Sequence, residues 1–378
     1  MPAIALYNLI HDKHKLLLAL VGIMFSVVLV TLQLGILANE TKNAGGLISH
    51  SGADVWVMQR GTRNVDQCEV ISERRYYQVI TVPGVAWAER LVVQFSPWKL
   101  SNGQHSTVTL VGLEPNSRLT LPWGMAVGDR DDIFHQNGII IDERERLRYG
   151  SPEGPLGIDD RLEIGGRRAR VAGFSSGVGT FTFSPYVFTS YKRAKEAGKL
   201  PPDATKYVVV KAMPGLSAEE LRDRILQRVG DVDAYTSSQF AAKTSYYWLI
   251  STGMGLGVVA AAAISLIVGT VIVGQTMYSA TIERLHEYGT LKALGMSNRA
   301  LGGIVVRQAI MTGMIGYVGG AVIAFFVGNH LTRYNVPVEV PPILLLVMLI
   351  VAVGMCVVAS ISSVVRVFRL EPAIVFRG

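Results

Sequence analysis

Motifs for catalysis and for nucleotide binding are missing from this sequence. A phosphate-binding G-x-x-x-x-G-K-[ST] loop, H-E-x-x-H, G-x-S-x-G and C-x-x-C do not occur. The seven histidines lack the spacing of metal ligands, and the acidic clusters 129–132 and 142–145 alternate with arginine as solvated surfaces do. We therefore predict a non-enzymatic chain with no metal site and no cofactor of its own.

Charged residues are also scarce, at 17% of 378 residues against about a quarter in typical soluble domains. Four segments contain none, and each exceeds the roughly 20 residues that a helix needs to cross the hydrocarbon core of a membrane. We predict four transmembrane helices from these segments, 16–39, 244–282, 308–332 and 340–365. The first is expected to be a retained anchor rather than a cleaved signal peptide, because it is long and no clean small-x-small site follows it. The absence of intramembrane charge disfavours an ion-coupled transporter.

Cysteine is rare as well. Cys68 lies in the long segment between the first two predicted helices and Cys356 lies within the fourth, so the two are not expected to pair. Cys68 is either an ordinary buried thiol or an intermolecular link.

The distribution of basic residues predicts the topology. Residues 40–243 contain 26 Lys and Arg against 24 Asp and Glu, whereas the short segments beside the other helix ends are clearly basic. The positive-inside rule therefore places both termini and the 283–307 connection in the cytoplasm. It favours a membrane protein over a nucleic-acid binder. The predicted order is a cytoplasmic segment 1–15, helix 16–39, an extracytoplasmic domain 40–243, a stalk and helix 244–282, a cytoplasmic connection 283–307, helix 308–332, an outer loop 333–339, helix 340–365 and a cytoplasmic tail 366–378.

The extracytoplasmic segment predicts a two-part α+β domain. Its two ends carry similar strand–helix–strand patterns and are expected to form one composite half, with strands at 53–58, 85–95, 206–212 and 232–235 and helices at 72–82 and after the capping residue Ser217. The middle, about 115–200, is expected to be richer in strands. Hairpins are predicted at Asn102-Gly103 and Gly165-Gly166, because these residues tolerate the positive φ of tight turns. Residues 174–185 are either a contact loop or an ordinary surface loop.

The second apolar segment is too long to lie wholly in a membrane. As a helix, 244–282 would span about 58 Å, so we place 249–274 in lipid and 239–248 in an outer stalk. Small residues recur four apart, which permits close helix approach within the chain or in a homodimer. The pairs are Gly253 and Gly257, Ala261 and Ser265, and Gly316 and Gly320.

The connection after this segment is charged and punctuated by glycine. Glu283 and Glu287 stand four apart beside Arg284, Gly289 and Gly295 bend the chain, and Ser297 can cap the next helix. On spacing alone, a docking helix for a partner and a plain connecting turn are equally good interpretations.

The same residues carry a resemblance to a known family. Arg284-x-x-Glu287-x-Gly289-x-Leu291-Lys292-Ala293-Leu294-Gly295 resembles the R-x-x-E-I-G-x-L-[KR]-A-L-G signature of FtsX/MacB-like (type VII) ABC transporter permeases, with Tyr288 in place of the usual Ile. Residues 5–10, 138–142, 163–173 and 369–377 are similar to other parts of the family pattern. The length and residues 180–190 look closest to the DevC-like exporter permeases, and haem-exporter permeases are near relatives.

The resemblance implies a homodimer bound to separate cytoplasmic ATPase subunits, which hold the ATP and Mg. It implies that Glu283, Arg284, Glu287, Gly289, Lys292 and Gly295 form the coupling element, and that hydrolysis drives the outer domain by mechanotransmission. We expect an exporter of an amphiphilic or lipid-like substrate in the bacterial inner membrane, in contact with lipids and with a periplasmic adaptor and an outer-membrane channel. The alternatives are an FtsX-like signalling scaffold that activates a cell-wall hydrolase and LolC-like lipoprotein extraction. The substrate-binding residues are unknown at this stage.

Overall fold

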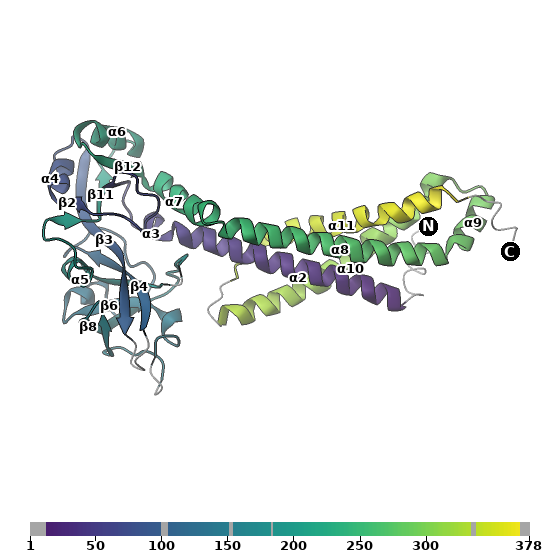
Figure 1. Cartoon of the computed structure of the whole chain (residues 1–378), viewed down its shortest axis with the longest axis horizontal. Coiled ribbons are helices and arrows are strands. Elements are labelled where there is room, and N and C mark those ends of the chain that lie inside the picture. The colour runs from purple at the N-terminus through teal and green to yellow at the C-terminus, as the bar shows by residue number, and fades with distance from the viewer. Residues whose placement is uncertain (1–12, 100–104, 151–153, 183, 334–337, 371–378) are drawn as a thin grey trace. The chain divides into compact units, whose positions relative to one another are not determined.

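The chain folds into two compact units. The computed structural model describes residues 13–99, 105–150, 154–182, 184–333 and 338–370. One unit comprises Met1–Asn39 and Gly255–Gly378 and is called the membrane unit here; the other, Glu40–Met254, is called the α+β domain (Figure 1). Parts of the predicted segments 1–15, 333–339 and 366–378, and the predicted turn at Asn102-Gly103, lie outside the described residues.

The membrane unit is helical. Four helices among the described residues are long and apolar enough to cross a membrane, as predicted. They are α2 (Lys13–Ala44), which ends within the α+β domain, α8 (Met254–Glu283), α10 (Asn298–Arg333) and α11 (Pro342–Phe368). A short fifth helix, α9 (Leu285–Ala293), connects α8 to α10.

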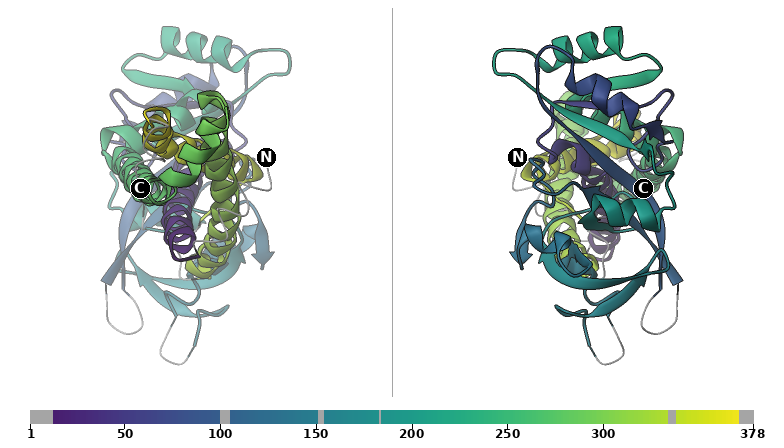
Figure 2. Two further views of the ribbon diagram at one scale, coloured as in Figure 1. Left: turned by 90° about the vertical axis from the view of Figure 1, so that its right-hand side faces the viewer. Right: turned by 90° about the vertical axis from the view of Figure 1, so that its left-hand side faces the viewer.

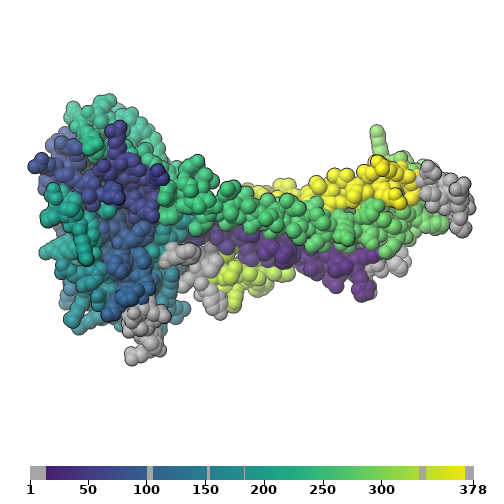
Figure 3. Space-filling model, in the orientation of Figure 1, coloured from purple at the N-terminus to yellow at the C-terminus, as the bar shows by residue number. Residues whose placement is uncertain are grey.

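The four long helices contact one another in a ring, visible end-on in Figure 2. A glycine lies at each contact. Gly22 of α2 faces Ile272 of α8, and Gly274 of α8 faces Ala359 of α11. Gly313 of α10 faces Cys356 of α11, and Gly316 of α10 faces Ile23 of α2. Because glycine has no side chain, the helix backbones approach closely at these positions. The space-filling view shows α8 and α2 side by side, with α8 open to the surface along its length (Figure 3).

The α+β domain contains the strands. Ten of them form one sheet in the order β12-β1-β11-β3-β4-β9-β6-β8-β5, with β7 pairing to β3 and β8. Their bounds are β1 Val55–Gln59, β3 Val85–Lys99, β4 His105–Leu113, β5 Met125–Val127, β6 Gly138–Asp142, β7 Arg161–Ile164, β8 Arg167–Ser175, β9 Tyr186–Ser190, β11 Tyr207–Ala212 and β12 Val232–Thr236. The short strands β2 (Ile71–Ser72) and β10 (Ala204–Thr205) form a separate pair.

Short helices connect the strands and cover the sheet. They are α3 (Gly46–Ser49), α4 (Arg74–Ile80), α5 (Tyr191–Ala197), α6 (Ala218–Arg228), α7 (Ser237–Tyr246), the 3-10 helices η1 (Arg130–Phe134) and η2 (Glu143–Glu145), and the π-helical turn η3 (Tyr247–Ser251). The Ser217 hydroxyl accepts a hydrogen bond from the Glu220 N–H, which confirms the predicted cap of α6. Glu220 does not complete a reciprocal capping box and instead pairs with Arg224 within the helix.

The ends of the domain segment meet in the sheet, as predicted. β1 pairs with both β11 and β12 in antiparallel register, with Val55 opposite Val210 and Thr236. The strands of the middle segment belong to the same sheet. The 15-residue strand β3 pairs with β11 near its start and with β4 and β7 near its end, so one sheet runs through both halves.

Three apolar clusters fill the domain and explain its stability. One surrounds Trp56 and Phe240, one surrounds Trp98 and Tyr149, and one joins β1, β11 and α6 around Val57 and related aliphatic residues. Trp56 and Trp98 have no exposed surface. Fully burying one large apolar side chain contributes about 2–3 kcal/mol, so each of these tryptophans stabilises the domain by about that amount.

Candidate functional site

The strongest candidate site is the α8–α9–α10 connection, where the sequence motif lies. α8 ends at Glu283, and Arg284 leaves the helical conformation with φ −99° and ψ 13° before α9 begins. Gly295 adopts φ +94°, a left-handed conformation that favours glycine, and this ends α9. Ser297 then accepts a hydrogen bond from the Ala300 N–H at 3.3 Å and caps α10. The connection is therefore a defined helix with two sharp boundaries.

One side of α9 is buried against its neighbours. Tyr288 is 3% exposed and packs with Leu301, Ile304, Val305 and Val367 of α10 and α11. Burial raises the pKa of Tyr288, which keeps its hydroxyl neutral. The aromatic ring at the position where the family motif carries Ile thus fills an apolar core.

Two cations of the motif make contacts within the chain. The Lys292 ammonium donates hydrogen bonds to the carbonyl oxygens of Phe368 at 3.2 Å and Leu370 at 2.7 Å, at the C-terminus of α11. A cation is favourable there because unpaired carbonyls and the helix dipole concentrate negative charge. Arg284 is half-buried beside Tyr288 at a cavity of about 60 Å³, too small for a ligand.

The opposite side of α9 is exposed. Glu287 projects from it together with His286, Thr290 and Leu294, and the Leu294 side chain is 80% exposed. Glu283 also lies at the surface, where it forms an ion pair with Lys15 of α2. An exposed leucine beside an exposed carboxylate is a surface that a protein partner can cover. We call Glu287, Thr290 and Leu294 the α9 face.

The predicted packing glycines fall into two groups. A Cβ at Gly316 would lie 2.6 Å from Ile23 Cγ2, and a Cβ at Gly320 would lie 2.8 Å from Val27 Cβ, so both sit at the α2–α10 contact. Gly253 and Gly257 have no atom within 4 Å of a built Cβ. They therefore pack against nothing among the described residues.

A second cluster lies in the α+β domain, around the buried carboxylate of Asp66. The indole N–H of Trp248 donates to one Asp66 oxygen at 3.0 Å, and the Tyr186 hydroxyl donates to the other at 3.2 Å. Burial raises the pKa of Asp66 to about 6, although both hydrogen bonds lower it. Trp248 belongs to the π-helical turn between α7 and α8, an element often found at functional sites.

The loop predicted as either a contact loop or a surface loop contributes to this cluster. Phe181 is 7% exposed and stacks on Trp248, with ring centroids 5.1 Å apart. Gly179 lies against Asn43 at the end of α2. The described part of the loop therefore contacts the C-terminal end of α2 and the turn after α7.

Cys68 is buried at 4% exposure, and both cysteines are free. Its thiol donates to the Glu69 carbonyl oxygen at 3.1 Å, and burial raises the pKa of the thiol. A buried, neutral thiol fits the interpretation of an ordinary core residue better than that of an intermolecular link.

Comparison with protein families places this geometry in context. The family described as FtsX-like permease C-terminal matches residues 259–372, which include α9 and its buried neighbours. The family described as MacB-like periplasmic core domain matches residues 16–228, more than half of the chain. The chain is an ABC transporter permease of the FtsX/MacB type.

Relatives of this permease are themselves ABC transporter permeases. One uncharacterized permease of Mycobacterium tuberculosis is 27% identical over 222 residues, which are 58% of each chain, and a second from that organism is 22% identical over 221 residues, again 58% of each. A permease of Methanocaldococcus jannaschii is 32% identical over 114 residues, 30% of this chain and 28% of that one. The chain thus spans 58% of the length of the M. tuberculosis relatives.

Two solved extracytoplasmic domains also match. The extracellular domain of the transporter YknZ from Gram-positive bacteria is 11% identical with a TM-score of 0.36, and the match covers 48% of this chain and 98% of that one. The periplasmic region of MacB from Actinobacillus actinomycetemcomitans is 11% identical with a TM-score of 0.39, covering 52% and 94%.

The six residues predicted to form the coupling element lie in different environments. Glu283 and Glu287 are at the surface, and Lys292 bonds to the end of α11. Arg284 is half-buried at a small cavity, Gly289 is buried and Gly295 forms the terminating turn. The sequence argument missed Thr290 and Leu294. Their spacing of three and seven from Glu287 was the available signal, because such residues share one helix face.

Proposed function

We propose that this permease couples ATP hydrolysis by a separate ABC ATPase to the export of an amphiphilic or lipid-like substrate. The α9 face carries the proposal. Leu294 offers apolar area to a partner, and Glu287 offers a charge that fixes the partner's orientation. The permease family implies an ATPase partner, and this face is suited to receive it.

A docked partner has a physical route to the rest of the membrane unit. The buried side of α9 is held to α10 and α11 through the Tyr288 cluster and Lys292. α10 in turn touches α2 through Gly316 and Gly320. Displacement of α9 therefore moves α10 and α11, and α10 transmits the movement to α2, because packed helices move as rigid elements. This sequence of contacts is our proposed basis for mechanotransmission.

We also propose a second copy of the permease in the working complex. The exposed side of α8 is apolar, and Gly257 on that helix has no neighbour among the described residues. Such a face suits either lipid or a second helix at close range. Basic residues beside the helix ends support cytoplasmic termini in an inner membrane. A periplasmic adaptor and an outer-membrane channel complete the proposed exporter.

The test is gentle purification of tagged, full-length permease from native membranes, followed by identification of the proteins that accompany it. Export predicts an ATPase together with a periplasmic adaptor. An ATPase accompanied by a peptidoglycan hydrolase would replace export by transmembrane signalling, and the absence of any ATPase would contradict both.

A further inference from the structure

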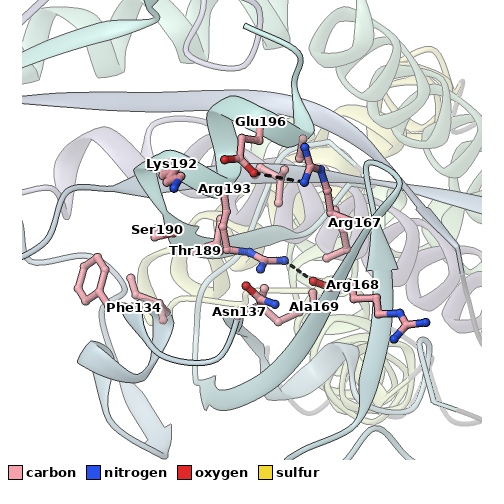
Figure 4. Close-up of a pocket in the computed structure, with 15 residues that line it drawn as sticks. Phe134, Asn137, Arg167, Arg168, Ala169, Thr189, Ser190, Lys192, Arg193 and Glu196 are labelled. Atoms are coloured by element: carbon pink, nitrogen blue, oxygen red, sulfur yellow. Dashed lines mark hydrogen bonds and ion pairs between the residues drawn. The ribbon is translucent and has the colours of Figure 1, made fainter. Parts of the chain in front are cut away.

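A cavity of about 410 Å³ lies in the α+β domain, apart from the residues described above. Its walls come from η1, from the starts of β6 and β8, and from the segment where β9 enters α5 (Figure 4). This volume is within the usual range for sites that bind small molecules. All of its lining residues belong to the α+β domain.

One wall of this cavity is positively charged. Arg193 is half-buried and donates a hydrogen bond to the backbone carbonyl oxygen of Arg168, and it forms no ion pair with a carboxylate among the described residues. Burial lowers the pKa of its guanidinium, and the charge of Glu196 offsets this only in part. Lys192 adds a second cation at the cavity. An anion from outside the chain would complete the interactions of Arg193.

The carboxylate of Glu196, at the same cavity, already forms an ion pair. Glu196 pairs with Arg167 at 3.6 Å, on the side of the cavity where Figure 4 also draws Arg193. The Arg168 guanidinium points away from Arg193 in the same view. With Glu196 balanced by Arg167, the charges of Arg193 and Lys192 remain as a surplus.

The other wall is apolar. Ile133, Ile139 and Ile164 are each at most 3% exposed and form part of the lining, and the ring of Phe134 stands at the end of the cavity away from Arg167. Asn137 and Thr189 add neutral polar groups to the lining. A ligand that fits both walls has an anionic head and a short apolar body.

We propose that this cavity binds a small anionic amphiphile, whose carboxylate or phosphate is held by Arg193 and whose apolar part lies against Phe134 and the isoleucines. Guanidinium groups bind planar carboxylates through two parallel hydrogen bonds, which gives both strength and orientation. That this amphiphile belongs to the exported substrate class rests on the proposed export function. That the cavity binds it does not depend on that function.

The test measures binding of octanoate and of its neutral analogue octanamide to full-length permease in lipid nanodiscs by calorimetry. Arg193→Gln is expected to weaken octanoate binding at least about tenfold, the effect of losing one charge-assisted pair, and to leave octanamide binding unchanged. Arg193→Lys retains part of the affinity. Arg161→Gln is the matched control, because Arg161 is exposed on β7 outside the cavity and its loss leaves octanoate binding at the wild-type level.

A second variant keeps the test decisive if Arg193→Gln does not fold. Glu196→Gln removes the carboxylate that pairs with Arg167 and is expected to tighten octanoate binding several-fold. Octanoate that binds no better than octanamide, or binding that neither variant changes, overturns the site. Recovery of the ATPase with these variants is measured in parallel. Wild-type permease that recovers the ATPase but does not bind octanoate rejects the cavity alone, whereas wild-type permease that binds octanoate but recovers no ATPase rejects the proposed function alone.

Discussion

Replacing Asp66 by Asn is expected to stabilise the α+β domain at neutral pH. Asp66 is 5% exposed, and its pKa rises from 3.8 to about 6 because burial removes water from the carboxylate. The hydrogen bonds from Trp248 and Tyr186 offset only part of this loss. An amide keeps both contacts without the charge, since its oxygen accepts from the indole N–H and its nitrogen donates to the tyrosine hydroxyl.

The sign and the magnitude follow from proton linkage. Between pH 3.8 and about 6 the folded chain keeps a proton that the unfolded chain has lost, so the free energy of unfolding falls as pH rises. The full difference between the two pKa values corresponds to about 3 kcal/mol at neutral pH. Asn does not titrate, so the variant lacks this contribution to the pH dependence. The stability advantage of the variant is therefore small near pH 4 and largest above about pH 6.

Urea unfolding of full-length permease in lipid nanodiscs, followed by tryptophan fluorescence, measures this effect. All five tryptophans lie in the α+β domain, so the signal reports that domain alone. We expect the advantage of Asp66→Asn over wild type to grow by about 1 kcal/mol between about pH 5 and about pH 7. Asp231→Asn, at an exposed position, is the control and adds no such pH-dependent difference. An advantage that is constant with pH, or that shrinks as pH rises, would refute the reasoning.

Three further substitutions, with Gly257→Leu as a control, test the packing of the membrane unit. Gly320→Leu places side-chain atoms where Val27 already lies and should destabilise the unit by about 1–3 kcal/mol. Gly257→Leu is the control, because a side chain at Gly257 has free space in the chain. Thermal unfolding in detergent compares the two variants. Gly295→Val forces a β-branched residue into the left-handed region and should cost about 1–2 kcal/mol, seen as faster hydrogen exchange in α9. Lys292→Met removes the hydrogen bonds to the carbonyl oxygens of Phe368 and Leu370 and should speed hydrogen exchange at Arg369 and Leu370; unchanged exchange would show that these bonds do not hold the end of α11.

The features that the sequence predicted are those set by local rules. Uninterrupted apolar segments indicate membrane helices because each charge in hydrocarbon is costly, and all four helices were found. The turn at Gly165-Gly166 was predicted from its need for positive φ, and both glycines have it, at 61° and 74°. The Ser217 cap was found for the same kind of reason.

The features that the sequence did not reveal depend on distant contacts. The continuity of β3 between the two halves of the sheet depends on its partners β11, β4 and β7, which periodicity does not specify. In the sequence Asp66 is not distinguishable from a surface aspartate. Its partners Tyr186 and Trp248 are more than a hundred residues away. The π-helical turn that presents Trp248 has no local signature in an apolar segment.

Only part of the candidate site was predicted, because the orientation of its side chains also depends on distant contacts. The motif located the connection between α8 and α10, but a motif cannot say which of its residues face outward. Lys292 is conspicuous as a charge, yet it bonds to the end of α11, whereas Leu294 looks like a core residue and is 80% exposed. Only the packing of Tyr288 against α10 and α11 determines which side of α9 is free.

The most direct measurement of the central claim is recovery of the ATPase with tagged Glu287→Lys permease from native membranes, quantified against wild type. Glu219→Lys is the matched control, because Glu219 is an exposed glutamate on α6 of the α+β domain. Reversal of a charge at a docking surface is expected to lower ATPase recovery by at least about tenfold, with normal membrane insertion of the permease. The Glu219 variant should recover the ATPase at the wild-type level. Full recovery and full ATP hydrolysis with Glu287→Lys would contradict the assignment of the α9 face as the coupling surface.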